Sequence, residues 1–221
     1  MRNGPAMRTS TARVYDRVAP LYDWLNAPME RMGGDARRAR VIAGASGRIL
    51  EIGVGTGRNL PLYSAAADVT AVDISARMLE RAEERARRSR APIRLQQADA
   101  EALPFRDGSF DTVTATCVLC SVRDPVRALR EVRRVVSPAG EVRLLEHVRP
   151  RNPVLGLLFD WLSPLTRRLI GPEINRRTEE NVRAAGLVIE TVRRDGIWRE
   201  IVARRTGSHG GGDNARERSI P

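Results

Sequence analysis

The sequence contains no lysine, so all 38 of its strongly basic side chains are arginine, against 27 acidic residues. The formal net charge of +11 has two explanations, a coding bias toward arginine or an anionic partner such as an acidic membrane surface. Aromatic residues make up only 4% of the chain. That scarcity argues against a base-stacking surface, and we expect no nucleic-acid partner.

Long apolar runs and cysteines are also scarce. No apolar run reaches the roughly 18 residues of a membrane span, so no transmembrane helix is predicted. The first seven residues lack the apolar core of a signal peptide, which predicts a cytoplasmic protein. The two cysteines, Cys117 and Cys120, have no second ligand pair nearby. We interpret them as packing residues at a strand end and predict no metal site.

The most informative segment is residues 48–57, where a short apolar run ends in three alternating glycines, and a second run ends at Asp73. This order is typical of the strand, tight loop, helix and strand of a nucleoside-binding half-fold. Glycines let a backbone approach its ligand, and a carboxylate can accept from both ribose hydroxyls. A dinucleotide dehydrogenase would have glycine at position 58, where Arg58 stands.

Strands and helices alternate along the rest of the chain, which predicts a doubly wound parallel α/β sheet. The expected strands span 48–53, 69–73, 93–97, 110–117 and 141–148, followed by a hairpin of 187–193 and 197–203. The first expected helix lies before residue 29 and is interrupted at Pro20. Another is expected to begin at Arg58, and the remaining helices are expected at 29–43, 75–88, 125–136 and 178–185. Residues 137–140 are expected to end the helix 125–136.

The segment Glu51–Gly57 resembles motif I of class I S-adenosylmethionine (SAM) methyltransferases, and residues 97–105 resemble the adenine-contacting loop of that family. The resemblance implies that the glycine loop lies under the methionine part of SAM, that Asp73 holds the ribose, and that Asp99 and Ala100 read the adenine. The implied cofactor-binding residues are Glu51, Gly53, Gly55, Gly57, Asp73, Ile74, Met78, Asp99, Ala100 and Cys117.

The same resemblance implies a Rossmann-like, mostly parallel seven-stranded sheet with an antiparallel last strand, and N-terminal helices that cap the cofactor. The expected segments are a flexible start at 1–11, cap helices at 12–47, a SAM-binding core at 48–150, a substrate lid with a helix and the final hairpin at 151–205, and a disordered tail at 206–221.

Candidates for catalysis and for acceptor binding are few. Tyr22 lies in the predicted cap and His147 follows the fifth strand, so both are candidate catalytic and substrate-binding residues. A purely structural His147 is equally compatible with the sequence. Trp161 belongs to an apolar stretch, residues 153–162, which is interpreted as a substrate lid or as core or homodimer packing.

Residues 15–26 resemble the start of ubiquinone/menaquinone C-methyltransferases and bacterial phosphatidylethanolamine N-methyltransferases, whereas 116–122 with 146–148 resemble membrane-associated thiol methyltransferases. These resemblances imply methyl transfer to a small hydrophobic acceptor, lipid-like or quinone-like first and a thiol second, with peripheral membrane contact. Two alternatives remain open at this point. One is a catalytically silent SAM-binding partner, and the other is a nicotinamide-dependent reductase, which the glycine spacing disfavours.

Overall fold

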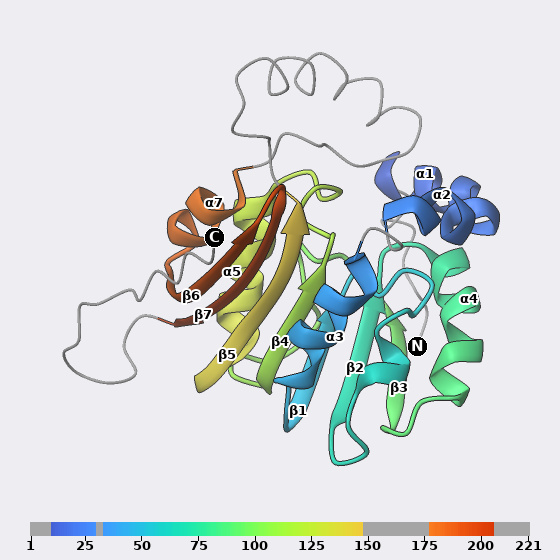
Figure 1. The fold of residues 1–221 in the computed structure, drawn as a ribbon. Helices are drawn as coiled ribbons and strands as arrows, with labels where there is room; N and C mark the ends of the chain where they lie inside the picture. The colour runs from blue at the N-terminus through green and yellow to red at the C-terminus, as the bar shows by residue number, and fades with distance from the viewer. Residues whose placement is uncertain (1–9, 30–32, 148–176, 206–221) are drawn as a thin grey trace, which may run out of the picture.

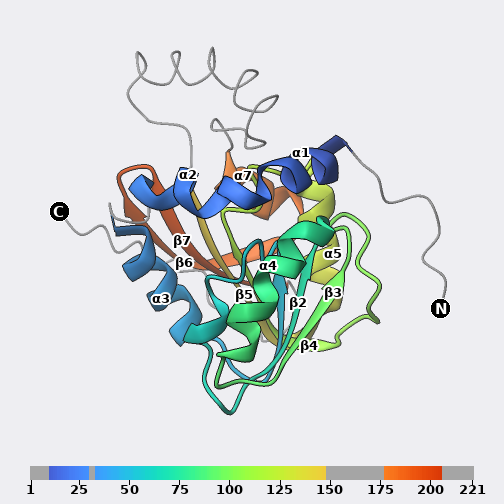
Figure 2. The same ribbon diagram turned by 90° about the vertical axis from the view of Figure 1, so that its right-hand side faces the viewer.

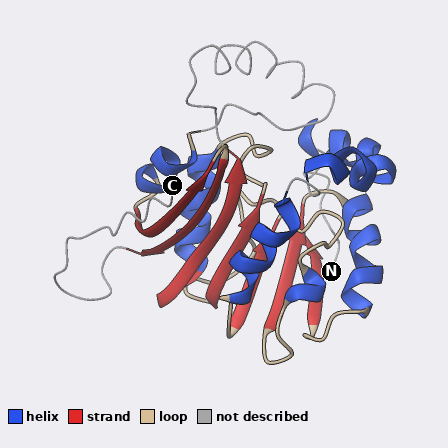
Figure 3. Ribbon diagram, viewed as in Figure 1, coloured by secondary structure: helices blue, strands red, loops and turns tan. Residues whose placement is uncertain are grey.

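The computed structural model describes residues 10–29, 33–147 and 177–205. Its strands form a single seven-stranded sheet in the order β3-β2-β1-β4-β5-β7-β6, with helices against both faces (Figures 1 and 3). The strands are β1 (Arg48–Ile52), β2 (Asp68–Asp73), β3 (Ile93–Gln97), β4 (Phe110–Thr116), β5 (Val136–His147), β6 (Leu187–Asp195) and β7 (Trp198–Arg205). The helices are α1 (Ser10–Val18), α2 (Tyr22–Met29), α3 (Asp35–Ala43), α4 (Ala76–Arg87), α5 (Pro125–Val135) and α7 (Thr178–Ala184), with 3-10 turns η1 (Ala19–Leu21) and η3 (Leu60–Leu62).

Strands β1 to β5 pair in parallel, and β7 is antiparallel to both of its neighbours, β5 and β6. Parallel neighbours need crossover connections, which place helices over the faces of the sheet. The predicted fold class is therefore confirmed, including the antiparallel last strand.

The core lies on both faces of the sheet. On one face, Leu50, Val113 and Leu144 pack with Leu129 and Val132 of α5. On the other face, buried residues of β1 and β2 pack with α3 and α4 through side chains such as Ile42 and Ala82. Burial on both faces explains why β1, β2 and β4 are apolar almost throughout.

Local capping signals in the sequence correspond to observed helix ends. The Ser75 hydroxyl accepts a hydrogen bond from the Met78 amide at 3.1 Å, and the Asp124 carboxylate accepts one from the Arg127 amide at 2.9 Å. Gly186 ends α7 with a φ of +78°. The interruption predicted at Pro20 is the turn η1.

One predicted element is wrong, and so is the predicted start of the fifth strand. No α-helix follows the glycine loop from Arg58, where the structure has only η3. Asn59 is buried there and its side chain bonds to Arg38, Glu51 and Thr116, which holds the backbone out of a regular helix. In addition, α5 ends at Val135, and Val136 begins β5 because it pairs with Phe110.

The predicted lid segment with Trp161 and the predicted tail, residues 206–221, lie outside the described residues, as does most of the predicted flexible start. The predicted helix 29–43 is seen as α3 from Asp35 onward. Within 10–29, 33–147 and 177–205, no helix has both the length and the apolar character needed to cross a bilayer.

Candidate active site

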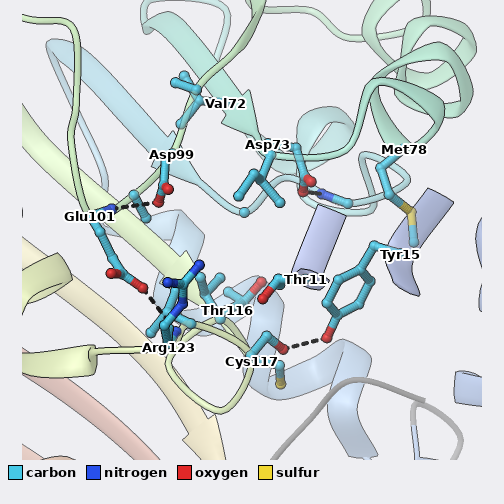
Figure 4. A pocket seen from close by; sticks show the side chains of 18 of the residues that line it. Thr11, Tyr15, Val72, Asp73, Met78, Asp99, Glu101, Thr116, Cys117 and Arg123 are labelled. Carbon is cyan, nitrogen blue, oxygen red and sulfur yellow. Dashed lines mark hydrogen bonds between the residues drawn. The ribbon is translucent and has the colours of Figure 1, made fainter. Parts of the chain in front are cut away.

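A pocket lies at the carboxyl edge of the parallel strands (Figure 4). Helices α1 and α2 lie across this edge of the sheet (Figure 2). The strand register explains this position, because Ile52 at the end of β1 pairs with Val72 of β2 and Ala115 of β4. The segments that follow these strands therefore meet at one edge. The lining includes nine of the residues singled out from the sequence, namely Tyr22, Gly53, Gly55, Asp73, Ile74, Met78, Asp99, Ala100 and Cys117.

Asp73 links the end of β2 to the glycine loop. One carboxylate oxygen accepts a hydrogen bond from the Gly55 amide at 2.8 Å, and the other accepts from the Ser75 amide at 2.9 Å. Burial raises the pKa of Asp73 to about 6, although these amides oppose the shift. A carboxylate offers about four acceptor positions, so this carboxylate can also accept from a ligand.

The three glycines serve two different purposes, although all have positive φ. A Cβ on Gly53 would lie 2.5 Å from a methyl carbon of Val118, and one on Gly57 would lie 2.9 Å from Leu60. Gly53 and Gly57 are thus needed for close packing, and Gly57 does not line the pocket. A Cβ on Gly55 would meet only the Tyr22 ring, at 4.0 Å. Gly55 therefore leaves open space for a ligand.

The segment after β3 forms the opposite wall. Asp99 accepts a hydrogen bond from the Glu101 amide at 2.9 Å, and Glu101 in turn accepts from the amides of Arg123 and Asp124 at 2.9 and 3.0 Å (Figure 4). Glu101 and Arg123 both line the pocket, and the sequence reasoning did not identify either. Glu101 thereby fixes the 99–103 loop to the start of α5.

The loop after β4 completes the wall near the glycine loop. Cys117 has a φ of +57°, the only positive value at a described residue other than glycine. Glu146 is fully buried and accepts from the amides of Val118 and Leu119 at 2.8 and 2.9 Å. Cys120 is buried, as a packing residue should be, whereas Cys117 borders the pocket. Across the described ranges, no three His, Cys, Asp or Glu residues are grouped as metal ligands.

The N-terminal cap consists of α1, η1 and α2, and two of its tyrosines face this loop. The rings of Tyr15 and Tyr22 line the pocket with centroids 6.2 Å apart and planes inclined at 63°. The Tyr15 hydroxyl is hydrogen-bonded to that of Ser121 (Figure 4). Burial raises the pKa of both phenols above the ordinary value, so both side chains are neutral. The sequence identified Tyr22 but not Tyr15, Thr11 or Ser121.

Two aspartates dock the cap onto the rest of the site. Asp16 accepts a hydrogen bond from the Ser75 hydroxyl at 2.6 Å. Asp23 accepts from the Thr56 hydroxyl and from Arg85, both at 2.8 Å, and from Arg58 at 3.2 Å. Neighbouring arginines hold the pKa of Asp23 at about 2 despite partial burial.

Glu51 lies below the pocket and does not line it. Its carboxylate accepts from the Asn59 amide group at 2.7 Å, and the buried Arg38 donates to Asn59 and Thr116 at 2.8 and 2.7 Å. Burial raises the pKa of Glu51 to about 7. This network supports the glycine loop from beneath, and direct cofactor contact by Glu51 stays a prediction.

His147 ends β5 and is buried edge-to-face against Trp198, with ring centroids 6.2 Å apart. Burial lowers its pKa, and it is not among the residues lining the pocket. Its role as a base or substrate contact stays a prediction, as does that of Trp161, which lies outside the described residues.

Comparison with known proteins agrees with this geometry. Residues 50–144 match the family described as "Methyltransferase domain". A phosphatidylethanolamine N-methyltransferase from Cereibacter sphaeroides is 41% identical over 148 residues, which cover 66% of this chain and 72% of that protein. The chain belongs to the class I SAM-dependent methyltransferases. A demethylmenaquinone methyltransferase from Renibacterium salmoninarum is also similar, with 35% identity over 189 residues covering 82% of this chain and 76% of the relative.

Solved structures give the same fold for this methyltransferase. A SAM-dependent methyltransferase from Thermotoga maritima superposes with a TM-score of 0.68 at 21% identity, covering 88% of this chain and 99% of that one. The pocket fits the cofactor, because Gly55 leaves open space beside the glycine loop and the Asp73 carboxylate can accept further hydrogen bonds. SAM is therefore the cofactor of this enzyme.

Proposed function

We propose that this enzyme transfers the methyl group of SAM to a small hydrophobic acceptor of the lipid or quinone type, with a thiol as second candidate. The distribution of charge in the pocket carries the proposal. Three of the four charged lining residues, Asp73, Asp99 and Glu101, lie at the end of β2 or in the loop after β3, which the resemblance assigns to adenosine, and the fourth, Arg123, donates its backbone amide to Glu101. The other described lining residues are uncharged, which favours an acceptor with an apolar body.

SAM, when bound, supplies a methyl group on a sulfonium: the carbon–sulfur bond breaks with its electron pair left on sulfur, while the acceptor atom bonds the methyl group and gives up a proton. The protein contributes mainly position and exclusion of water. Asp73 holds the ribose and Gly55 lets the backbone approach the cofactor. The neutral phenols of Tyr15 and Tyr22 cover the pocket and limit the entry of solvent.

The relatives support the choice of acceptor class. Their names specify a phospholipid, phosphatidylethanolamine, and a lipid-soluble quinone, demethylmenaquinone. Both are hydrophobic molecules that reside in membranes. The resemblance of residues 116–122 to thiol methyltransferases supports the second candidate.

The outer side of the cap supports delivery of the acceptor from a membrane surface. Trp24 of α2 and Leu21 of η1 are 76% and 60% exposed, and Arg13 and Arg17 of the preceding α1 are also exposed. Exposed aromatic and apolar side chains beside arginines suit the interface of an anionic bilayer. Co-sedimentation with anionic vesicles should exceed that with zwitterionic vesicles, and Trp24→Ala should reduce it. If the wild type and Trp24→Ala sediment equally with both kinds of vesicle, this part of the proposal is wrong.

The acceptor is tested by incubating the purified enzyme with methyl-labelled SAM and a panel of acceptors. The panel contains phosphatidylethanolamine in mixed micelles, a short-chain demethylmenaquinol and an alkyl thiol, and mass spectrometry identifies the labelled product. We expect label in the lipid or the quinol. If SAM binds normally and none of the three is labelled, the chain is better explained as a silent SAM-binding partner.

A further inference from the structure

The cap contains the same dipeptide twice, Tyr15-Asp16 and Tyr22-Asp23. The seven-residue spacing corresponds to about two helical turns, so corresponding side chains lie on the same side of the cap. The two tyrosines line the pocket, and the two aspartates bond to the segments beside it. The repeat therefore places a pair of rings and a pair of anchors together.

The anchors hold the rings at defined positions. Asp16 bonds to Ser75, two residues after the ribose-binding carboxylate Asp73. Asp23 bonds to Thr56 and Arg85, and Thr56 lies inside the glycine loop. Each tyrosine is thus adjacent in sequence to a residue that is fixed against a cofactor-binding segment.

The Tyr22 ring lies beside the glycine loop, and the Tyr15 ring packs against the Tyr22 ring. The Tyr22 ring comes within 4.0 Å of the position that a Cβ on Gly55 would occupy. The Tyr15 ring makes an edge contact with the Tyr22 ring. In this family the glycine loop lies under the methionine part of SAM, which carries the sulfonium. Aromatic faces attract cations, most strongly where water is excluded.

We propose that Tyr15 and Tyr22 form an aromatic cover that recognises the positive charge of the sulfonium and so strengthens the binding of SAM relative to that of its demethylated product. When the methyl group leaves, the electron pair of the broken bond stays on sulfur. S-adenosylhomocysteine therefore has a neutral thioether at this position and loses the charge-dependent attraction to the rings. The cover strengthens binding of the donor more than binding of the product.

The test is calorimetric titration with SAM and with S-adenosylhomocysteine, read as the ratio of the two dissociation constants within each variant. The ratio cancels any loss of folded protein. Tyr22→Phe keeps the ring and should keep the wild-type ratio. Tyr22→Leu and Tyr15→Leu should each reduce the preference for SAM about 3- to 10-fold.

A matched control comes from a second edge-to-face pair, Phe105 and Phe110, whose rings are 5.1 Å apart outside the pocket lining. Phe105→Leu should leave the ratio unchanged. A wild-type ratio in both tyrosine-to-leucine variants would overturn the proposal, as would an equal change in Phe105→Leu. No acceptor is needed, so the result is independent of the acceptor proposed above.

Discussion

The carboxylate of Asp73 accepts a hydrogen bond from the backbone amide of Gly55 at 2.8 Å. This contact joins the end of β2 to the glycine loop after β1, eighteen residues earlier in the chain. Two segments to which the resemblance assigns different parts of the same cofactor are thereby fixed to each other without it. The site is preorganised, which reduces the ordering cost of binding.

Asp73→Ala should weaken SAM binding by more than tenfold. The variant loses the acceptor proposed for the ribose and leaves the Gly55 amide without its partner, and such losses typically cost about 1–3 kcal/mol each. Titration calorimetry measures the change. Asp68→Asn at the opposite end of β2 is the control, because Asp68 forms a surface ion pair with Arg94 at 2.8 Å. Wild-type affinity in Asp73→Ala would contradict the assignment.

Gly53→Ala should mainly reduce the stability of the fold, whereas Gly55→Ala should mainly reduce SAM binding. A methyl group on Gly53 collides with Val118 at 2.5 Å, so this variant should lose on the order of 2–4 kcal/mol of unfolding free energy. A methyl group on Gly55 adds only about 1–2 kcal/mol of backbone strain but occupies the ligand space. We expect thermal melting to separate the two variants and SAM titration to show lost binding in a folded Gly55→Ala. If the Gly55→Ala variant folds and binds SAM with wild-type affinity, Gly55 does not keep space open for the ligand.

Asp23→Asn should loosen the cap. The change removes the charge that pairs with Arg85 at 2.8 Å and Arg58 at 3.2 Å, and SAM affinity should fall about 5- to 10-fold. Limited trypsin digestion should cut faster after Arg13 and Arg17 of α1, and mass spectrometry detects these cuts. The control Asp35→Asn alters an aspartate that is 70% exposed and pairs with Arg58 only at 3.6 Å. Similar cutting rates in both variants would show that Asp23 does not secure the cap.

Glu51→Gln should change how stability depends on pH. Because burial raises the pKa of Glu51 from 4.5 to about 7, the folded chain binds the proton more tightly than the unfolded chain does. Its stabilisation is complete below about pH 4.5 and is lost as pH rises through 7. Between pH 5 and 8 the wild type should lose roughly 2–3 kcal/mol more than the variant. Urea unfolding at both pH values tests this, and identical losses would contradict it. The buried carboxyl of Asp73, whose pKa is also raised, is present in both proteins, so the comparison isolates Glu51 together with its coupling to Asp73.

The sequence predicted the sheet, and it placed the candidate site at the sheet edge where the pocket lies, because both depend on local signals. Apolar runs separated by capping residues marked strands and helices, and parallel strands must bring the glycine loop, Asp73 and Asp99 to one edge. The same local reasoning failed at residue 58, where the polar contacts of Asn59 with Arg38 and Thr116 override helix formation. It also failed at Val136, whose strand partner Phe110 is distant in sequence.

The contacts that hold the cap could not be read from spacing. Asp16 meets Ser75 across 59 positions, and Asp23 meets Arg85 across 62. One signal was present in the sequence, since the repeated Tyr-Asp pair at a two-turn interval marks one face of a helical segment. That pattern would have identified Tyr15 and both aspartates before any coordinates were known.

The insertion of β7 between β5 and β6 has a consequence for synthesis on the ribosome. The edge of β5 receives its partner only when the final strand, ending at Arg205, has emerged from the exit tunnel. Until then the nascent polypeptide presents an unpaired backbone edge, which invites association with other chains. A premature stop codon before Trp198 would leave that edge permanently open and make the shortened product a target for degradation.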